Sequence, residues 1–210
     1  MRLRRIKDAK EKLEEFKDIV CLNPQDNKGK WQEFFPVSQP IYLEIGMGKG
    51  QFIIENAKRY PKINFIGCEL SDSIVLKAAR KIRNLDLKNL MLININANRL
   101  DDVFAPNEIS HLFLNFSDPW PKTRHEKRRL TFDSYLEIYL RILKKPAVIE
   151  FKTDNRKLFE YSLMKFDEFQ FKITELSLNL HEDNDDVITT EYEDKFKSLG
   201  QTIYFVKVEK

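Results

Sequence analysis

Short apolar runs alternate with amphipathic segments through most of this chain, and this alternation restricts the fold more than any other feature. The runs of strand length are residues 41–45, 64–69, 90–96, 111–116 and 147–152. The segments with helical spacing between them are residues 50–59, 72–84, 132–143 and 156–166. Strands that alternate with helices are joined by right-handed crossovers and pair in parallel. The sequence therefore predicts an α/β fold with a doubly wound, mostly parallel sheet.

Both ends of the chain depart from this alternation. Residues 3–19 place Ile6, Leu13 and Phe16 at near-helical spacing among many charges, which predicts an amphipathic, basic N-terminal helix. Residues 169–178 and 202–208 are strand-like runs separated by a polar segment, which predicts a C-terminal antiparallel pair. We expect residues 1–22 to pack on or near one main domain formed by residues 23–210.

Composition excludes several classes of protein. With 210 residues, of which 42% are hydrophobic, the chain can bury one sizeable core. Cys21 and Cys68 are too far apart in sequence for a zinc motif and do not suggest a disulfide framework, so we assign no metal and expect a reducing, cytoplasmic location. No stretch approaches the roughly 18 apolar residues of a membrane span. The net charge of +3 is too small to prove nucleic-acid binding.

A glycine-rich turn follows the first of the predicted strands. Gly46, Gly48 and Gly50 lie where the strand must turn into a helix, and glycine allows both positive φ and close contact between backbone and ligand. The spacing is G-x-G-x-G, so the dinucleotide pattern G-x-G-x-x-G is not met. A nucleoside cofactor without a pyrophosphate fits better, although such a turn alone is often only a tight connection.

Polar residues end the next two predicted strands. Glu69 lies 19 positions after Gly50, where a carboxylate can accept hydrogen bonds from both hydroxyls of a ribose. Asn96 has an amide suited to an adenine edge, and the small Ala97 leaves room for the ring. Glu44, near the end of the first strand, suits a cationic ligand group. Glu69 or Asn96 alone could instead cap a helix, but three successive strand ends together favour an adenosine-containing cofactor such as S-adenosylmethionine.

The segment 115–131, N-F-S-D-P-W-P-K-T-R-H-E-K-R-R-L-T, joins a carboxylate and a tryptophan to a cluster of cations. Asp118 and the Pro119-Trp120-Pro121 turn follow an apolar run, and Trp120 is interpreted either as a platform for an extruded base or as a core residue. The cations would form a solvated face or, as we expect from their density, contact phosphates. They are Lys122, Arg124, Lys127, Arg128 and Arg129.

Four motifs together resemble the bacterial tRNA (guanine-N7-)-methyltransferase family. They are E-I-G-M-G-K-G at 44–50, the segment 115–131, F-K-T-D-N at 151–155 and T-E-Y-E-D-K-F at 190–196. The similarity runs from about residue 40 to the end of the chain. It implies a Rossmann-like class I methyltransferase domain at residues 23–210. It also implies S-adenosylmethionine as cofactor, tRNA as partner, and a guanine at position 46 of the tRNA variable loop as target.

The resemblance also implies roles for individual residues. The positions that match cofactor-binding residues are Glu44, Glu69, Asn96 and Asp118. The positions that match substrate-binding residues are Lys122, Asp154, Thr190, Glu191, Tyr192 and Glu193. The RNA-contacting stretch corresponds to Arg124, His125, Glu126, Lys127, Arg128 and Arg129. Thr190 and Glu193 also form the T-x-x-E pattern of a capping box, which predicts a short helix ending near Gly200.

The chemistry of guanine N7 makes modest demands on the residues. N7 has a free lone pair and can attack a methyl group without first losing a proton, so no strong general base is needed. The protein must position the base and stabilise the positive charge that develops on it. We interpret Asp118 and Asp154 as the catalytic residues, which orient guanine through its N1–H and N2–H groups and stabilise that charge.

Three other functions remain open from the sequence. One is methylation of an exocyclic base amine, for which a carboxylate or amide before proline is also suited. Another is a non-catalytic RNA-binding module on the same fold. A nicotinamide-dependent oxidoreductase is disfavoured by the glycine spacing. The sequence leaves a homodimer possible and shows no motif for an obligate protein partner.

Overall fold

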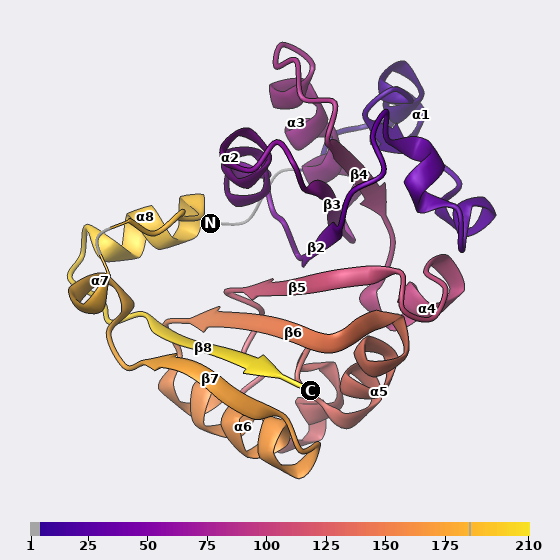
Figure 1. Cartoon of the computed structure of the whole chain (residues 1–210). Coiled ribbons are helices and arrows are strands. Elements are labelled where there is room, and N and C mark those ends of the chain that lie inside the picture. Colours follow the sequence, from indigo (N-terminus) through magenta and orange to yellow (C-terminus); the bar gives the residue numbers. More distant parts are fainter. Residues whose placement is uncertain (1–4, 185) are drawn as a thin grey trace.

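The computed structural model describes residues 5–184 and 186–210, and its centre is an eight-stranded sheet (Figure 1). The strands are β1 (Val20–Cys21), β2 (Ile41–Ile45), β3 (Asn64–Glu69), β4 (Leu90–Asn94), β5 (Ile109–Asn115), β6 (Leu143–Thr153), β7 (Lys172–Ser177) and β8 (Tyr204–Glu209). Their order is β1-β4-β3-β2-β5-β6-β8-β7. Strands β1 to β6 pair in parallel, and β8 runs antiparallel between β6 and β7. The predicted mostly parallel sheet with a C-terminal antiparallel pair is confirmed.

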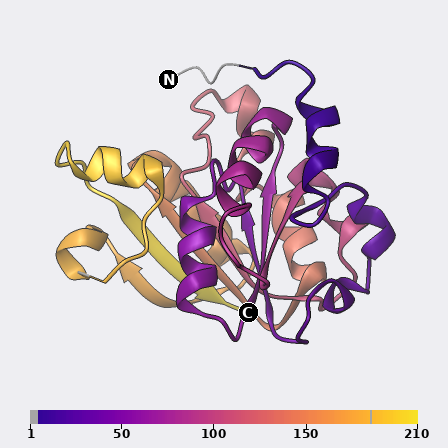
Figure 2. The same ribbon diagram turned by 90° about the horizontal axis from the view of Figure 1, so that it is seen from above.

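Helices cover both faces of the sheet, and each face has its own hydrophobic core (Figures 1 and 2). The longer helices are α2 (Gln51–Arg59), α3 (Asp72–Ile82), α5 (Asp133–Ile142) and α6 (Arg156–Glu168); the shorter ones are α1 (Ala9–Lys12), α4 (Leu100–Val103), α7 (Leu180–Asp183) and α8 (Glu191–Lys197). Helices α1 to α3 share one core, and α4 to α6 share the other. None of these described helices is long and apolar enough to cross a membrane.

Two central strands, β2 and β3, have the bounds that the sequence predicts, whereas β5 and β6 begin earlier than predicted, at Ile109 and Leu143. β2 is an apolar run between Pro40 and Gly46, and β3 is an apolar run that begins with the polar Asn64 and ends with Glu69. Within β3, Gly67 leaves space that the Met47 side chain occupies, since a Cβ at Gly67 would collide with the Met47 sulfur and lie 3.1 Å from Leu92 Cδ2. A glycine in this strand therefore packs the turn after β2 against the sheet.

The N-terminal helix predicted at residues 3–19 is wrong in its extent. Of residues 5–19, which the structure describes, only the short α1 and a 3₁₀ turn at Leu13–Phe16 are helical. Asp8 has a φ of 53°, in the left-handed region, which prevents a regular helix from passing through it. The Ile6 N–H donates to Ser73 Oγ at 2.8 Å instead of to a helical carbonyl. Leu3 and Arg4 of the predicted helix lie outside the described residues.

The apolar residues of this segment nevertheless reach the core. Leu13, Phe16 and Val20 are buried with α2 and α3, as their spacing suggests. Val20 and Cys21 form β1, which pairs in parallel with β4 and was not predicted. The N-terminal segment thus completes one edge of the sheet.

Candidate active site

The candidate site lies where the carboxyl ends of the parallel strands meet. After β2 the chain turns through Gly46, Gly48 and Gly50, whose φ angles are 76°, 58° and 85°. The N–H groups of Gly46 and Met47 both donate to the Cys68 carbonyl at the end of β3, at 2.8 and 3.1 Å. Residues other than glycine rarely adopt these φ values, so the turn depends on glycine, as the sequence predicts. The backbone of this turn lines a neighbouring cavity.

That cavity has a volume of about 420 Å³ and lies between the glycine turn and α8. One wall is formed by residues 46–49 and Ile74, and the floor by Asn115 and Phe116 at the end of β5. The other wall is formed by residues 190–192 and 195–196. Two segments that are separated by about 140 positions in the chain therefore enclose one site.

Glu69 is fixed at the edge of this turn. Its Oε2 accepts from the Gly48 N–H at 3.3 Å, and its Oε1 accepts from the Ser71 N–H at 3.0 Å. Burial raises its pKa, as does the nearby Asp118 carboxylate, while the backbone hydrogen bonds lower it. Each oxygen keeps a further lone pair, so the predicted contact with ribose hydroxyls is compatible with this geometry.

Glu44 is a buried carboxylate with one unsatisfied oxygen. The residue is 1% exposed, and its Oε1 accepts from Asn115 Nδ2 at 2.9 Å. Among the described residues its Oε2 has no hydrogen-bond partner. Burial raises the pKa of Glu44 to about 7, while Asn115 and the Lys152 cation lower it. A buried carboxylate oxygen without a partner is costly, and a cationic ligand group would satisfy it.

Asn96 adopts the capping role that was the alternative to an adenine contact. It begins a 3₁₀ turn at Ala97–Arg99, and its Oδ1 accepts from the Asn98 N–H at 3.1 Å. β4 therefore ends at Asn94, two residues earlier than predicted. Asn96 is exposed and Ala97 is buried, so the predicted contact of the Asn96 amide with adenine stays a prediction.

The two predicted catalytic carboxylates lie near the hydroxyl of Tyr192. The Tyr192 hydroxyl donates to Asp154 Oδ2 at 3.1 Å. Burial and the charges of Asp154 and Asp118 raise the pKa of Tyr192 to about 12. The Tyr192 ring lies 5.2 Å from the ring of Phe116. The structure thus joins residues from the ends of β5 and β6 with a residue of α8.

The predicted capping box is present at the start of α8. Thr190 Oγ1 accepts from the Glu193 N–H at 3.0 Å, and a Glu193 oxygen accepts from the Thr190 N–H at 3.2 Å. Glu191 lines the cavity and pairs with Lys81 of α3. Glu193 is fully buried and pairs with Lys152 at 2.8 Å, so it makes a structural contact, and its expected substrate contact stays a prediction.

The cationic segment forms a 3₁₀ helix at Thr123–Arg128 on the surface. Arg124, Lys127 and Arg128 are exposed, as are Lys122 and Asp118, while His125 and Glu126 are half-buried. Arg129 points inward instead. Its guanidinium donates to the carbonyls of Pro119 and Trp120, each at 3.2 Å, and lies 4.3 Å from the Tyr161 ring centroid. Arg129 therefore anchors the turn that contains Trp120.

Trp120 is not a core residue. It is half-buried and has a φ of 41°. The Arg128 guanidinium lies 4.7 Å from its ring centroid, and the His125 ring meets it edge-on at 5.6 Å. The core interpretation of this tryptophan is wrong, and a partly exposed ring beside cations agrees with the platform interpretation.

Sequence reasoning missed three residues that shape the site. Lys152 is buried in β6, Asn115 binds Glu44, and Asn94 Nδ2 donates to the Glu69 and Leu70 carbonyls at 3.0 Å each. Lys152 interrupts an apolar run, and a lysine in a central parallel strand requires a buried partner. That interruption was the available signal.

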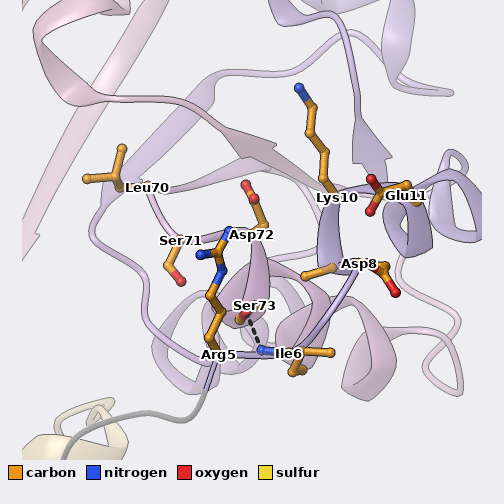
Figure 3. Close-up of a pocket in the computed structure, with 10 residues that line it drawn as sticks. Arg5, Ile6, Asp8, Lys10, Glu11, Leu70, Ser71, Asp72 and Ser73 are labelled. Carbon is orange, nitrogen blue, oxygen red and sulfur yellow. Dashed lines mark hydrogen bonds between the residues drawn. The ribbon is translucent and has the colours of Figure 1, made fainter.

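A larger cavity, of about 620 Å³, lies beside the turn after β3 (Figure 3). Charges of both signs line it: the cations of Arg5 and Lys10, and the carboxylates of Asp8, Glu11 and Asp72. The carboxyl ends of β5 and β6 do not contribute to it. Size alone therefore does not identify the site, and the smaller cavity beside the strand-end groups is the better candidate.

Comparisons with known proteins identify the family of this chain. Residues 38–206 match the model of the family Methyltransf_4, described as "Putative methyltransferase". The tRNA (guanine-N(7)-)-methyltransferase of Bacillus subtilis strain 168 is 50% identical over 210 residues, which are 100% of this chain and 99% of that protein. A protein of the same name from Listeria welshimeri is 50% identical over 205 residues, 97% of this chain and 96% of that one.

The chain belongs to the tRNA (guanine-N(7)-)-methyltransferase family. The solved structure of a SAM dependent methyltransferase from Aquifex aeolicus has the same fold, with a TM-score of 0.58 and 15% identity over 96% of this chain and 89% of that one. The family model covers every strand-end residue described above. The N-terminal α1 and β1 lie before its first matched residue, although the relative from Bacillus subtilis aligns with them as well.

Glu44 should make the stability of the ligand-free protein depend on pH. The pKa of Glu44 rises from 4.5 to about 7 on folding, because the folded protein favours the protonated carboxyl group. The stability of the folded protein is therefore highest below about pH 4.5, and the contribution of Glu44 to it is lost as the pH rises through 7. The shift corresponds to about 3 kcal/mol. Relative to the unaltered protein, Glu44→Gln should therefore gain about this free energy of unfolding between pH 4.5 and 8.

Urea unfolding of both proteins at pH 4.5 and 8 measures this difference. Glu137→Gln, at an exposed glutamate of α5, is the control and should follow the unaltered protein at both pH values. A constant offset between Glu44→Gln and the unaltered protein at the two pH values would contradict the assignment.

Proposed function

We propose that this protein transfers the methyl group of S-adenosylmethionine to N7 of a guanine in the tRNA variable loop, at position 46. Its family membership supports the reaction and the substrate. The observation that carries the proposal is a single cavity between the glycine turn and Tyr192. On the side of the glycine turn, Asn115 lines the cavity and binds Glu44, whose other oxygen has no partner among the described residues. On the other side, Tyr192 binds Asp154. A site for a cationic nucleoside and a site for a purine edge are thus adjacent.

The residues present fit the cofactor. Glu44 offers a buried carboxylate oxygen without a partner to a cationic group, and Glu69 offers both oxygens to ribose hydroxyls at the glycine turn. Asn96 and Ala97 remain the proposed contacts for adenine. When bound, S-adenosylmethionine supplies a sulfonium methyl group that the guanine nitrogen can attack. The chain's own part is to hold this ligand and to align the base with it.

Asp118 and Asp154 are the proposed groups for guanine. A carboxylate accepts hydrogen bonds only, which matches the N1–H and N2–H donors of guanine and distinguishes it from adenine. The Tyr192 hydroxyl holds one oxygen of Asp154 and leaves the other available. Both carboxylates also stabilise the positive charge that the purine gains, since N7 needs no proton acceptor.

The exposed cations of the 3₁₀ helix are the proposed contacts for tRNA phosphates. Arg124, Lys127 and Arg128 extend from a turn that Arg129 anchors, and Trp120 lies in the same turn beside Arg128. Lys122 precedes them at this turn. Stacking of a base on Trp120 would place an unstacked nucleotide close to Asp118. We place this reaction in the cytoplasm, where both buried cysteines stay reduced.

Identification of the product tests the proposal directly. The purified protein is incubated with S-adenosylmethionine and an unmodified tRNA transcript, and the methylated nucleoside is identified and located by mass spectrometry. We expect 7-methylguanosine in the variable loop. Another methylated base would overturn the assigned substrate, and tight tRNA binding without methylation would favour a non-catalytic module.

The two aspartates should matter for turnover more than for folding. Asp118→Asn and Asp154→Asn each replace an acceptor oxygen with a donor and remove a stabilising charge, so kcat on tRNA should fall about 100-fold. Asp167→Asn, at an exposed position on α6, is the matched control and should leave kcat unchanged. Near-normal kcat in both site variants would exclude the proposed electrostatic role.

The exposed cations should control the salt dependence of tRNA binding. Arg124→Ala or Lys127→Ala should weaken binding and make the slope of log K against log salt concentration shallower by about 1 for each phosphate that is no longer neutralised. Arg141→Ala, at an exposed arginine of α5 that pairs with Asp101, should leave the slope unchanged. Filter-binding titrations over a range of salt concentrations measure the slope. An identical slope in all three variants would exclude these phosphate contacts.

A further inference from the structure

Lys152 is a buried cation that the proposed chemistry does not use. It lies in β6, its side chain is 5% exposed, and its Nζ is 2.8 Å from Glu193 Oε2 and 3.0 Å from the Ile188 carbonyl. The same ammonium lies 4.8 Å from the Phe52 ring centroid of α2. A lysine in such surroundings is held only by specific partners, because its desolvation is costly.

Its partner Glu193 organises the start of α8. One Glu193 oxygen accepts from both Lys152 and the Thr190 N–H, and thus closes the capping box. The other oxygen lies 3.1 Å from His181 Nε2 of α7. Because Lys152 also binds the Ile188 carbonyl, it fixes the chain on both sides of the cap. The first turn of α8 is therefore attached to the centre of the sheet.

That first turn holds the residues that face the cavity. Tyr192, next to Glu193, donates to Asp154 at 3.1 Å. Two other attachments of α8 involve groups closer to the surface: Glu191 pairs with Lys81, and Asp194 accepts from Gln51 Nε2 at 2.6 Å. Exposed ion pairs contribute little to stability. The Lys152–Glu193 pair, with side chains 5% and 0% exposed, is thus more deeply buried than these two attachments.

Lys152 also lies close to the cofactor side of the cavity. It pairs in register with Asn115 of β5, and Asn115 donates to Glu44 at 2.9 Å. The Lys152 cation lowers the pKa of Glu44, whereas the carboxylates of Glu191 and Glu69 raise it. One ammonium therefore acts on a cofactor carboxylate at one side and on the substrate-facing helix at the other.

We propose that Lys152 is a positioning residue for methyl transfer: by binding Glu193 beneath α8, it sets the placement of Tyr192 and Asp154 relative to Glu44. The proposal rests on the proposed function. It assigns to Lys152 no contact with guanine or with the reacting methyl group. It replaces the substrate contact expected for Glu193 with an indirect role through the Lys152–Glu193 pair.

Stability alone does not account for this pair. Replacing a buried ion pair with apolar or neutral groups of similar volume is often neutral or stabilising, while removal of one partner leaves an uncompensated charge. If stability were the only requirement, an apolar residue at position 152 would stabilise β6 equally well. The contacts of Lys152 with Glu193 and with the Ile188 carbonyl instead hold the first turn of α8 in one direction relative to the sheet.

The test compares Lys152→Met, Glu193→Gln and the double variant with Lys165→Met. Lys165 is a matched control, since it is a largely buried lysine that pairs with Asp133 at 2.9 Å and with Glu168 at 2.6 Å, away from the site. Lys152→Met and Glu193→Gln should each lower kcat for tRNA methylation about 100-fold, because a displacement of about 1 Å is enough for such a loss. Lys165→Met should retain the kcat of the unaltered protein.

The double variant separates position from stability. It leaves no unpaired charge, so its melting temperature should return close to that of the unaltered protein, while its kcat should stay about 100-fold low. Recovery of kcat together with the melting temperature would show that the pair acts only on stability and would overturn the proposal. This outcome is informative even if a single variant folds poorly.

The pH dependence of S-adenosylmethionine binding gives a second readout that does not depend on tRNA. Binding of a cation requires the ionised Glu44, so affinity should fall on the acidic side of a midpoint near its pKa of about 7. Lys152→Met removes a cation near Glu44 and should move this midpoint to higher pH. Glu193→Gln removes an anion and frees the ammonium, and should move it to lower pH.

Calorimetric titrations from pH 6 to 8 measure the two midpoints. Opposite shifts support the proposal, whereas shifts in the same direction, or none, would overturn it because simple structural damage affects both variants alike. Failure of the proposed function is distinguishable, since the unaltered protein would then give no 7-methylguanosine while the pH midpoints would still be measurable.

Discussion

Parallel pairing in register is the constraint on which the rest of the molecule depends. β2 pairs with β3 on one side and with β5 on the other, and β5 pairs with β6, so four strands end at one edge. Side chains that are scattered between Glu44 and Asp154 in the chain meet there for this reason alone. The C-terminal β8 and β7 extend the same sheet, and the connection between them brings α8 across that edge.

Four carboxyl groups gather at this edge of the sheet. Glu44, Glu69, Asp118 and Asp154 lie at or near the ends of these strands, and Lys152 is a buried cation close to them. Such a field suits a ligand that arrives with positive charge, and it continues to suit the reaction as that charge passes to the base. Cations are instead concentrated on the exposed 3₁₀ helix, where phosphates would be. The carboxylates of the strand ends and the cations of the 3₁₀ helix thus match, respectively, the positively charged cofactor and the negatively charged tRNA of the proposed reaction.

The sequence predicts those features that follow from local pattern. The bounds of β2 and β3, the left-handed glycines and the capping box at Thr190 all depend on neighbouring residues, and all are confirmed. Features that depend on distant residues were not predictable. The spacing of Ile6 and Leu13 does not reveal that Asp8 is left-handed, and a lysine in a pattern is ordinarily interpreted as exposed. The burial of Glu193 could be inferred only by pairing it with Lys152, 41 positions away.

The two-residue strand β1 has a consequence for how copies of the chain meet one another. It covers the outer side of β4, whose residues 90–93 are buried. Without it, a hydrophobic strand would present its free N–H and C=O groups to solvent, and such edges recruit other chains. The N-terminal segment therefore covers an edge that would otherwise be open to strands of other chains. Removal of the segment would expose this edge, so aggregation would accompany any effect of the truncation on RNA binding.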